Sequence, residues 1–203
     1  PYANKNIYLF LGGFILALGI ENSGLHKRIA LKMIIAVGSS GASLVGGFML
    51  VAALISMWIM NTSTTLMLLP IGLAIAGVVQ KTTSLDKDFS NFQTALLLGI
   101  AYAATIGGMA TPIGTGPNLV VMTLLQKQGL EISFTNWMLL ATPISVIMLI
   151  VGWWLLTQII FPVHISGTDE TKKSLQKMYA SLGNISVDEK RVLIIFCFTA
   201  LAW

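Results

Sequence analysis

Long stretches of this chain contain no charged side chain. Residues 44–80, 92–125 and 137–161 carry no Asp, Glu, Lys, Arg or His. An α-helix needs roughly 20 mainly apolar residues to cross the hydrocarbon core of a bilayer. Only 10% of the residues are Asp, Glu, Lys or Arg, against about 25% in a typical soluble domain. The sequence therefore predicts an all-α, polytopic membrane protein.

The alternation of apolar and polar residues divides the chain into five segments. The last of them stops after about 18 Å of helix, too short to cross a bilayer, so we expect the chain to be part of a longer protein. The segments are a scaffold-type span with an interfacial helix (1–43), a hairpin with its tip at 60–65 (44–80), a connector and broken helix with an unwound loop at 107–118 (81–130), a long span with a cytoplasmic loop (131–191) and the start of a truncated span (192–203).

The first apolar run is interrupted by the polar residues 61–65. This break is compatible with a re-entrant hairpin whose tip lies within the membrane. It is also compatible with a tight turn outside the membrane, because each half has about 17–20 residues. Thr62, Ser63 and Thr64 are good N-caps, so in either case the positive end of the second helix lies at the tip.

A second break, at 107–118, holds four glycines and two prolines, which an undisturbed α-helix does not accommodate. The flanking segments 92–106 and 118–130 are each too short to cross alone, at roughly 22 and 20 Å. We therefore predict that they cross once together, with an unwound middle. Interrupted apolar segments of this kind are typical of a transporter's binding site, because non-helical backbone is tolerated at membrane depth only beside protein or water.

Lysine and arginine set the expected orientation. If 44–80 leaves and returns on one side, while 92–125 and 137–161 each cross once, ten of the 12 Lys and Arg residues share one face. We expect the protein in the inner (plasma) membrane of the cell, and the positive-inside rule places that face on the cytoplasmic side. The loops on that side are 22–40, 81–91 and 162–191.

The absence of charge inside the spans limits the chemistry. It argues against a proton relay and against an embedded enzyme, and the single Cys197 provides no disulfide or metal cluster. The basic residues lie mostly in loops on one side of the membrane, where they set the orientation of the protein, so no nucleic-acid partner is expected. No organic cofactor is expected either. A small anionic substrate would be held by hydroxyls, amides and helix N-termini, each worth about half a charge. Sodium ions bound beside the substrate would neutralise its remaining negative charge.

Three motifs in register resemble one known family. They are 24–30, the hydroxyl-rich run 56–65 followed by 67–71, and the Gly-rich run 99–108 followed by 113–118. Together they resemble the divalent anion/sodium symporter family, in particular the N-terminal repeat of a prokaryotic di-/tricarboxylate or sulfate transporter. The likeness extends over nearly all of residues 7–203.

This resemblance implies a fold and a set of site residues. The chain would hold the first of two inverted repeats, with a re-entrant helical hairpin and a broken transmembrane helix, in a homodimer that moves substrate by an elevator-type mechanism. Asn61 and Thr62 would bind the substrate carboxylate. Sodium would be bound by Ser56, Met60, Asn61 and Gly108. The unwound loop would contribute Gly107, Thr111, Gly114, Thr115, Pro117 and Asn118.

One residue departs from the family pattern. Met60 stands where the family usually has serine, and a thioether is a weak acceptor that cannot donate a hydrogen bond. The main prediction is sodium-coupled uptake of C4 dicarboxylates such as succinate, malate and fumarate. The alternatives are a sodium-independent exchanger and a carrier of sulfate or another oxyanion. From another class, the chain could be a channel component or an inactive half-transporter.

Overall fold

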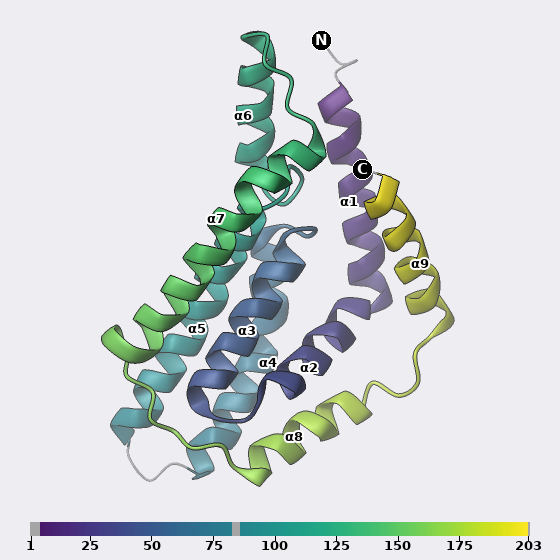
Figure 1. The fold of residues 1–203 in the computed structure, drawn as a ribbon. Coiled ribbons are helices and arrows are strands. Elements are labelled where there is room, and N and C mark those ends of the chain that lie inside the picture. Colours follow the sequence, from purple (N-terminus) through teal and green to yellow (C-terminus); the bar gives the residue numbers. More distant parts are fainter. Residues whose placement is uncertain (1–4, 83–85, 203) are drawn as a thin grey trace.

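The computed structural model describes residues 5–82 and 86–202, and these are helical with short links (Figure 1). No strand occurs among them, which confirms the predicted all-α fold. The elements are α1 (Lys5–Ser23), α2 (Leu25–Val37), α3 (Gly41–Ser56), α4 (Asn61–Thr82), α5 (Asp86–Met109), α6 (Gly116–Lys127), α7 (Phe134–Trp154), the π-helical turn η1 (Leu155–Ile160), α8 (Asp169–Ala180) and α9 (Val187–Ala202).

Three helical stretches are long and apolar enough to cross a membrane, which confirms the polytopic prediction. They are Asn61–Lys81, Asp86–Met109 and Phe134–Ile160, and shorter apolar helices cover Leu11–Ser23 and Gly41–Ser56. Only 11% of the apolar window in the third stretch is buried, against 56% in the second. The α7–η1 helix therefore offers most of its apolar side chains to its surroundings, as expected of a helix bordered by lipid.

The length of α5 differs from the prediction that residues 92–106 are too short to cross alone. The helix begins earlier, at Asp86, where Asp86 and Asp88 lie in its first turn and interact favourably with the positive helix end. It also continues through Gly107 and Gly108. These extensions give 24 residues, enough to span without α6.

The core of the molecule lies between α3, α4 and α5. Fully buried side chains from all three helices meet there, including Phe48, Leu68, Phe92 and Leu96. Helices in a membrane gain little from the hydrophobic effect, so their association depends on close packing and on small residues. Gly107 of α5 meets this condition, since it lies directly against the backbone of Ala53 in α3.

The basic segments gather at one end of this bundle. In Figure 1 the end of α4, the start of α5 and α8 lie at the lower end, and α2 runs toward it. The start of α1 and the end of α6 lie at the upper end. The chain thus runs upward through α5 and continues in the same direction into α6. Lys-rich α8 shares the end expected to face the cytoplasm.

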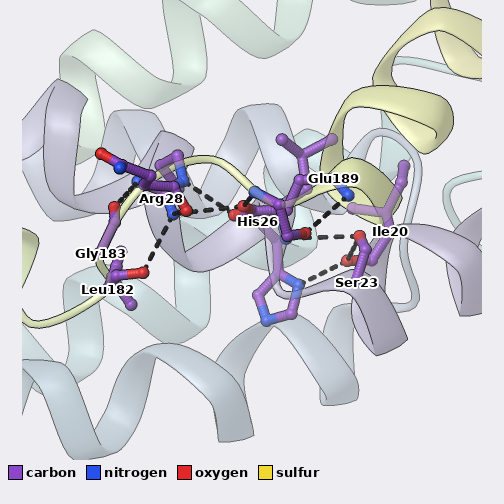
Figure 2. A network of polar contacts seen from close by, with 10 residues as sticks. Ile20, Ser23, His26, Arg28, Leu182, Gly183 and Glu189 are labelled. Atoms are coloured by element: carbon purple, nitrogen blue, oxygen red, sulfur yellow. Dashed lines mark hydrogen bonds and ion pairs between the residues drawn. The ribbon is translucent and has the colours of Figure 1, made fainter.

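A sharp elbow joins α1 to α2. Gly24 has a positive φ of 76°, in the left-handed region where glycine carries no Cβ penalty. Two side chains hold the end of α1: Ser23 Oγ and His26 Nδ1 both donate to the Ile20 carbonyl, at 3.1 and 2.8 Å. Figure 2 shows both bonds. Burial lowers the pKa of His26, so its ring remains neutral at physiological pH.

Arg28 ties α2 to the start of α9 (Figure 2). Its Nε donates to Glu189 Oε1 at 2.8 Å, and its terminal nitrogens donate to the carbonyls of Leu182, Gly183 and Asn184. Glu189 also accepts from the Ser186 amide at 2.6 Å, while Ser186 Oγ accepts from the Glu189 amide at 3.0 Å. This reciprocal pair is a capping box, so one carboxylate both begins α9 and binds α2.

Replacing Arg28 by lysine should loosen this junction. Lysine keeps the charge but lacks the planar fork of donors that reaches a carboxylate and several carbonyls together. We expect severalfold faster amide exchange over residues 182–190 of the full-length protein, measured by mass spectrometry. Lys27→Ala, on the exposed neighbouring position, is the control. Unchanged exchange in Arg28→Lys would show that the capping box alone orders the link.

The same junction should weaken in acid. The hydrogen bond from Arg28 is the main cause that lowers the pKa of Glu189 below its usual value. A lowered carboxyl pKa means that the stabilisation is complete above the ordinary glutamate pKa and is lost as pH falls through the lowered value. Once the exchange rates are corrected for the intrinsic pH dependence of amide exchange, the protection of residues 182–190 should therefore fall at acidic pH in the parent protein.

Candidate functional site

The turn of the α3–α4 hairpin lies earlier than predicted. The helix α3 ends at Ser56 and α4 begins at Asn61, so the turn is residues 57–60 rather than 60–65. The polar residues 61–65 form the first turn of α4. Hydroxyl and amide side chains favour this position because the first N–H groups of a helix have no intrahelical partner. In addition, the Thr65 hydroxyl donates to the Asn61 carbonyl at 2.9 Å.

Ser56 and Asn61 face each other across that turn. Ser56 Oγ donates to Asn61 Oδ1 at 2.7 Å, and Ser56 is fully buried while Asn61 is half-buried. The bond joins the last residue of α3 to the first residue of α4. It fixes the Asn61 amide group with its oxygen directed into the protein.

The unwound segment is shorter than the predicted 107–118. Residues 110–115 separate α5 from α6, whereas Gly107 and Gly108 are helical and Pro117 and Asn118 lie in the first turn of α6. Proline is tolerated in a first helical turn because its missing N–H would have no intrahelical partner. The prediction of a break is right in place but too wide at both ends.

Two polar side chains replace the missing helical hydrogen bonds. Asn118 Nδ2 donates to the carbonyls of Gly108 and Thr111, at 2.9 and 2.7 Å. The Thr111 hydroxyl accepts from the Gly114 amide at 3.1 Å and donates to the Met57 carbonyl in the hairpin turn. Thr111 and Asn118 are both buried. The link between α5 and α6 is thus stabilised by hydrogen bonds within itself and is bonded to the hairpin turn.

Glycine allows the two breaks to approach closely. A Cβ added at Gly108 would lie 3.1 Å from Asn61 Cγ and closer still to its Oδ1. A Cβ added at Gly114 would lie within 2.9 Å of the carbonyl oxygens of both Gly108 and Ser56. Neutral oxygens from the hairpin and from the broken helix therefore meet at one place.

Neutral amide, hydroxyl and carbonyl oxygens suit a hard cation. Among the described residues, no group of three or more His, Cys, Asp or Glu could hold a transition metal. The N-terminus of α4, at Asn61, and that of α6, at Gly116, border the same place. Each carries about half a positive charge, so an anion is also favoured nearby.

The structure brings together most, but not all, of the predicted site residues. The convergent group comprises Ser56, Asn61, Gly107, Gly108, Thr111, Gly114 and Asn118. Thr62 and Pro117 are exposed and Thr115 is half-buried. The Met60 side chain is 52% exposed, and its carbonyl accepts from the Thr64 amide at 3.0 Å. Its thioether therefore lies outside the buried group.

Two contacts and one buried side chain at this site were not predicted from the sequence. The Met57 carbonyl receives the Thr111 hydroxyl, and Trp137 Nε1 of α7 donates to the Met109 carbonyl at the end of α5, at 3.1 Å. Thr64 is fully buried in the first turn of α4, where the sequence indicated only a capping role. Neither backbone acceptor has a sequence signal, since any residue type supplies a carbonyl.

Asn118→Leu should destabilise the broken helix. The change removes the donor to the Gly108 carbonyl and leaves the Thr111 carbonyl with only a long bond from the Gly114 amide, at 3.4 Å. A buried unpaired group costs about 1–3 kcal/mol, so we expect the free energy of unfolding to fall by about 1–3 kcal/mol, seen as a lower melting temperature of the full-length protein in detergent. Asn91→Leu removes a comparable bond, to the Pro162 carbonyl, away from the site. Equal losses in both variants would contradict a special role for Asn118.

The chain matches, over residues 1–203, the family described as the sodium:sulfate symporter transmembrane region. It belongs to the sodium:sulfate symporter family. This confirms the resemblance inferred from the three motifs. The members of this family are transporters rather than enzymes, and the apolar helices of this chain are those of a multi-pass membrane protein.

Curated relatives within the sodium:sulfate symporter family are similar along the whole chain. The sodium-dependent dicarboxylate transporter SdcS of Staphylococcus saprophyticus is 36% identical over 206 residues, which cover 100% of this chain and 40% of that protein. SdcS of Staphylococcus aureus (strain USA300) is 35% identical with the same coverage. The chain thus spans about 40% of the length of these relatives.

Proposed function

We propose that the full-length protein is a sodium-coupled transporter that imports C4 dicarboxylates, such as succinate, malate and fumarate, across the plasma membrane. The observation that carries this proposal is the convergence of the hairpin turn and the broken helix around Gly108 and Gly114. Two independent interruptions of the helical backbone meet there and present neutral oxygens. The names of the SdcS relatives, which specify sodium and dicarboxylate, support the same assignment.

The charge balance explains why sodium would accompany the substrate. A dicarboxylate dianion meets no Lys, Arg or His in the spans of this chain, and two helix N-termini supply only about one positive charge together. Sodium at Ser56, Asn61 and Gly108 would neutralise much of the remainder. Asn61 and Thr62, at the N-terminus of α4, would contact one carboxylate.

The hydrogen bonds between the two breaks suit an elevator-type movement. Because Thr111 attaches the link after α5 to the hairpin turn, α3, α4, α5 and α6 would move as one body. The helices α1 and α2 would then belong to the stationary scaffold of a homodimer. The second inverted repeat would supply the other half of the substrate site.

A second candidate is a sodium-independent exchanger of the same fold. Met60 favours it, because its exposed thioether leaves the sodium site without the hydroxyl that the family usually has there. Sulfate is a further candidate substrate, since the family description names it and it shares the dianionic charge of a dicarboxylate.

The test is uptake of radiolabelled succinate into proteoliposomes that hold the full-length protein. Inward gradients of sodium, potassium and choline are compared, with sulfate as competitor. Saturable uptake in sodium alone supports the symporter. Uptake only into vesicles preloaded with dicarboxylate, whatever the cation, would establish the exchanger. Inhibition of the labelled uptake by sulfate but not by unlabelled dicarboxylate would reassign the substrate.

A further inference from the structure

A buried hydroxyl beside the convergent group has no hydrogen-bond partner. Thr64 lies in the first turn of α4 with 0% of its surface exposed, and its Oγ1 is unpaired in the protein. Within the part of the chain that the structure describes, two other buried hydroxyls share this condition, those of Thr142 and Ser145, but they belong to α7, whose apolar window is only 11% buried. Thr64 is different because it lies within the α3–α4–α5 core.

The unpaired state of Thr64 is energetically unusual. A buried hydroxyl without a partner costs about 1–3 kcal/mol, and threonine in a helix usually donates to the carbonyl four residues earlier. The neighbouring Thr65 does so, with Asn61. For Thr64 that carbonyl belongs to Met60 and receives only the Thr64 amide. Its hydroxyl therefore remains available to a ligand.

Thr64 lies one helical turn beyond Asn61, which contributes one of the oxygens already described. Residues three apart on a helix share one face, with about 5–6 Å between their Cβ atoms. Thr64 is thus the next side chain after Asn61 on the face of α4 that packs into the core. The same face continues with the buried Leu68, Ile71 and Ile75, so Thr64 is the last polar position before an apolar stripe.

We propose that the Thr64 hydroxyl is a ligand of the coupling sodium ion, completing the oxygen group formed by Asn61 and the carbonyls of Ser56 and Gly108. This inference rests on the proposed sodium-coupled transport and adds a residue to its ion site. A hydroxyl oxygen here supplies what Met60 does not, because the Met60 side chain is 52% exposed and carries sulfur. The departure at position 60 is then compatible with sodium coupling.

The test separates a ligand role from a packing role. Thr64→Val removes the hydroxyl at nearly constant volume, and Thr64→Ser keeps it. The full-length protein is titrated with sodium chloride against choline chloride at fixed ionic strength, and the melting temperature is recorded in detergent. A ligand that binds only the folded state raises this temperature as its concentration exceeds its Kd.

We expect Thr64→Val to melt at the same temperature as the parent in choline, or higher, because it removes an unpaired buried hydroxyl. Its Kd for sodium, fitted to this titration, should rise by about tenfold, the equivalent of 1.4 kcal/mol, while that of Thr64→Ser should stay within about twofold of the parent. Thr105→Val is the control, since that hydroxyl is exposed and donates to the Ala101 carbonyl.

The outcomes distinguish this inference from the proposed function. A sodium response in the parent that Thr64→Val leaves unchanged would overturn the ligand role and leave sodium coupling intact. A lower melting temperature of Thr64→Val in choline, with an unchanged sodium titration, would mean a structural hydrogen bond and also overturn it. No sodium response in the parent would remove both the ion site and the coupling.

Discussion

Gly107→Ala is expected to prevent the close packing of α3 against α5. The added Cβ would lie 2.6 Å from the carbonyl carbon of Ala53 and closer still to its oxygen and Cα. Those atoms belong to the backbone, so no side chain can rotate away. Overpacking a core typically costs about 1–3 kcal/mol, and because two helix backbones must separate here we expect the upper end, about 3 kcal/mol. The measurement is the melting temperature and the folded fraction of the full-length protein by size-exclusion chromatography.

Gly77→Ala is the matched control for this experiment. Gly77 also lies inside a helix, α4, but a Cβ added there meets nothing within 4 Å. Alanine in an exposed helix interior is favoured over glycine by about 0.5–1 kcal/mol, so this variant should be as stable as the parent or more so. If Gly107→Ala behaved like Gly77→Ala, the contact with Ala53 would not be the close approach described.

Asn61→Ala should reduce transport more than any other single side-chain truncation at the hairpin. Asn61 Oδ1 is the atom that receives Ser56 Oγ and faces Gly108. Its loss removes a proposed ligand of both the substrate and sodium. A tenfold loss of affinity for either one corresponds to about 1.4 kcal/mol. We expect succinate uptake by proteoliposomes to fall by at least about tenfold, with near-normal insertion into the membrane.

The stability of this variant separates binding from folding. Removing Asn61 leaves the buried Ser56 hydroxyl unpaired, which costs about 1–3 kcal/mol, so a moderate fall in melting temperature is expected. Asn91→Ala loses a bond to the Pro162 carbonyl outside the site and should transport normally. Normal uptake by Asn61→Ala would remove the hairpin turn from the binding site.

The helices were the most predictable part of this protein. Uncharged runs of about 20 residues have few alternatives to membrane helices. The three motifs in register were enough to indicate the family. The inverted repeat, the dimer and the elevator movement stay predictions. They concern arrangements beyond this chain or changes of state that one conformation does not test.

The limits of the breaks were predicted less well, for local physical reasons. Residues 61–65 have the composition of a turn, yet the same hydroxyl and amide groups also suit the first turn of a helix. Gly107 and Gly108 suggested unwinding, whereas they remain helical and serve close packing with α3 and α4. Sequence composition alone does not distinguish a glycine needed for backbone freedom from one needed for space.

The contacts of Arg28 join residues far apart in the chain, and this sets an order of events during synthesis. Glu189 lies 161 positions after its partner. At a translation rate of about 5–20 residues per second, roughly 8–30 s separate the emergence of the two side chains. During that interval α2 has its basic side chain in place without its carboxylate. The α2–α9 junction is therefore completed late, when α3 to α7 have already been made.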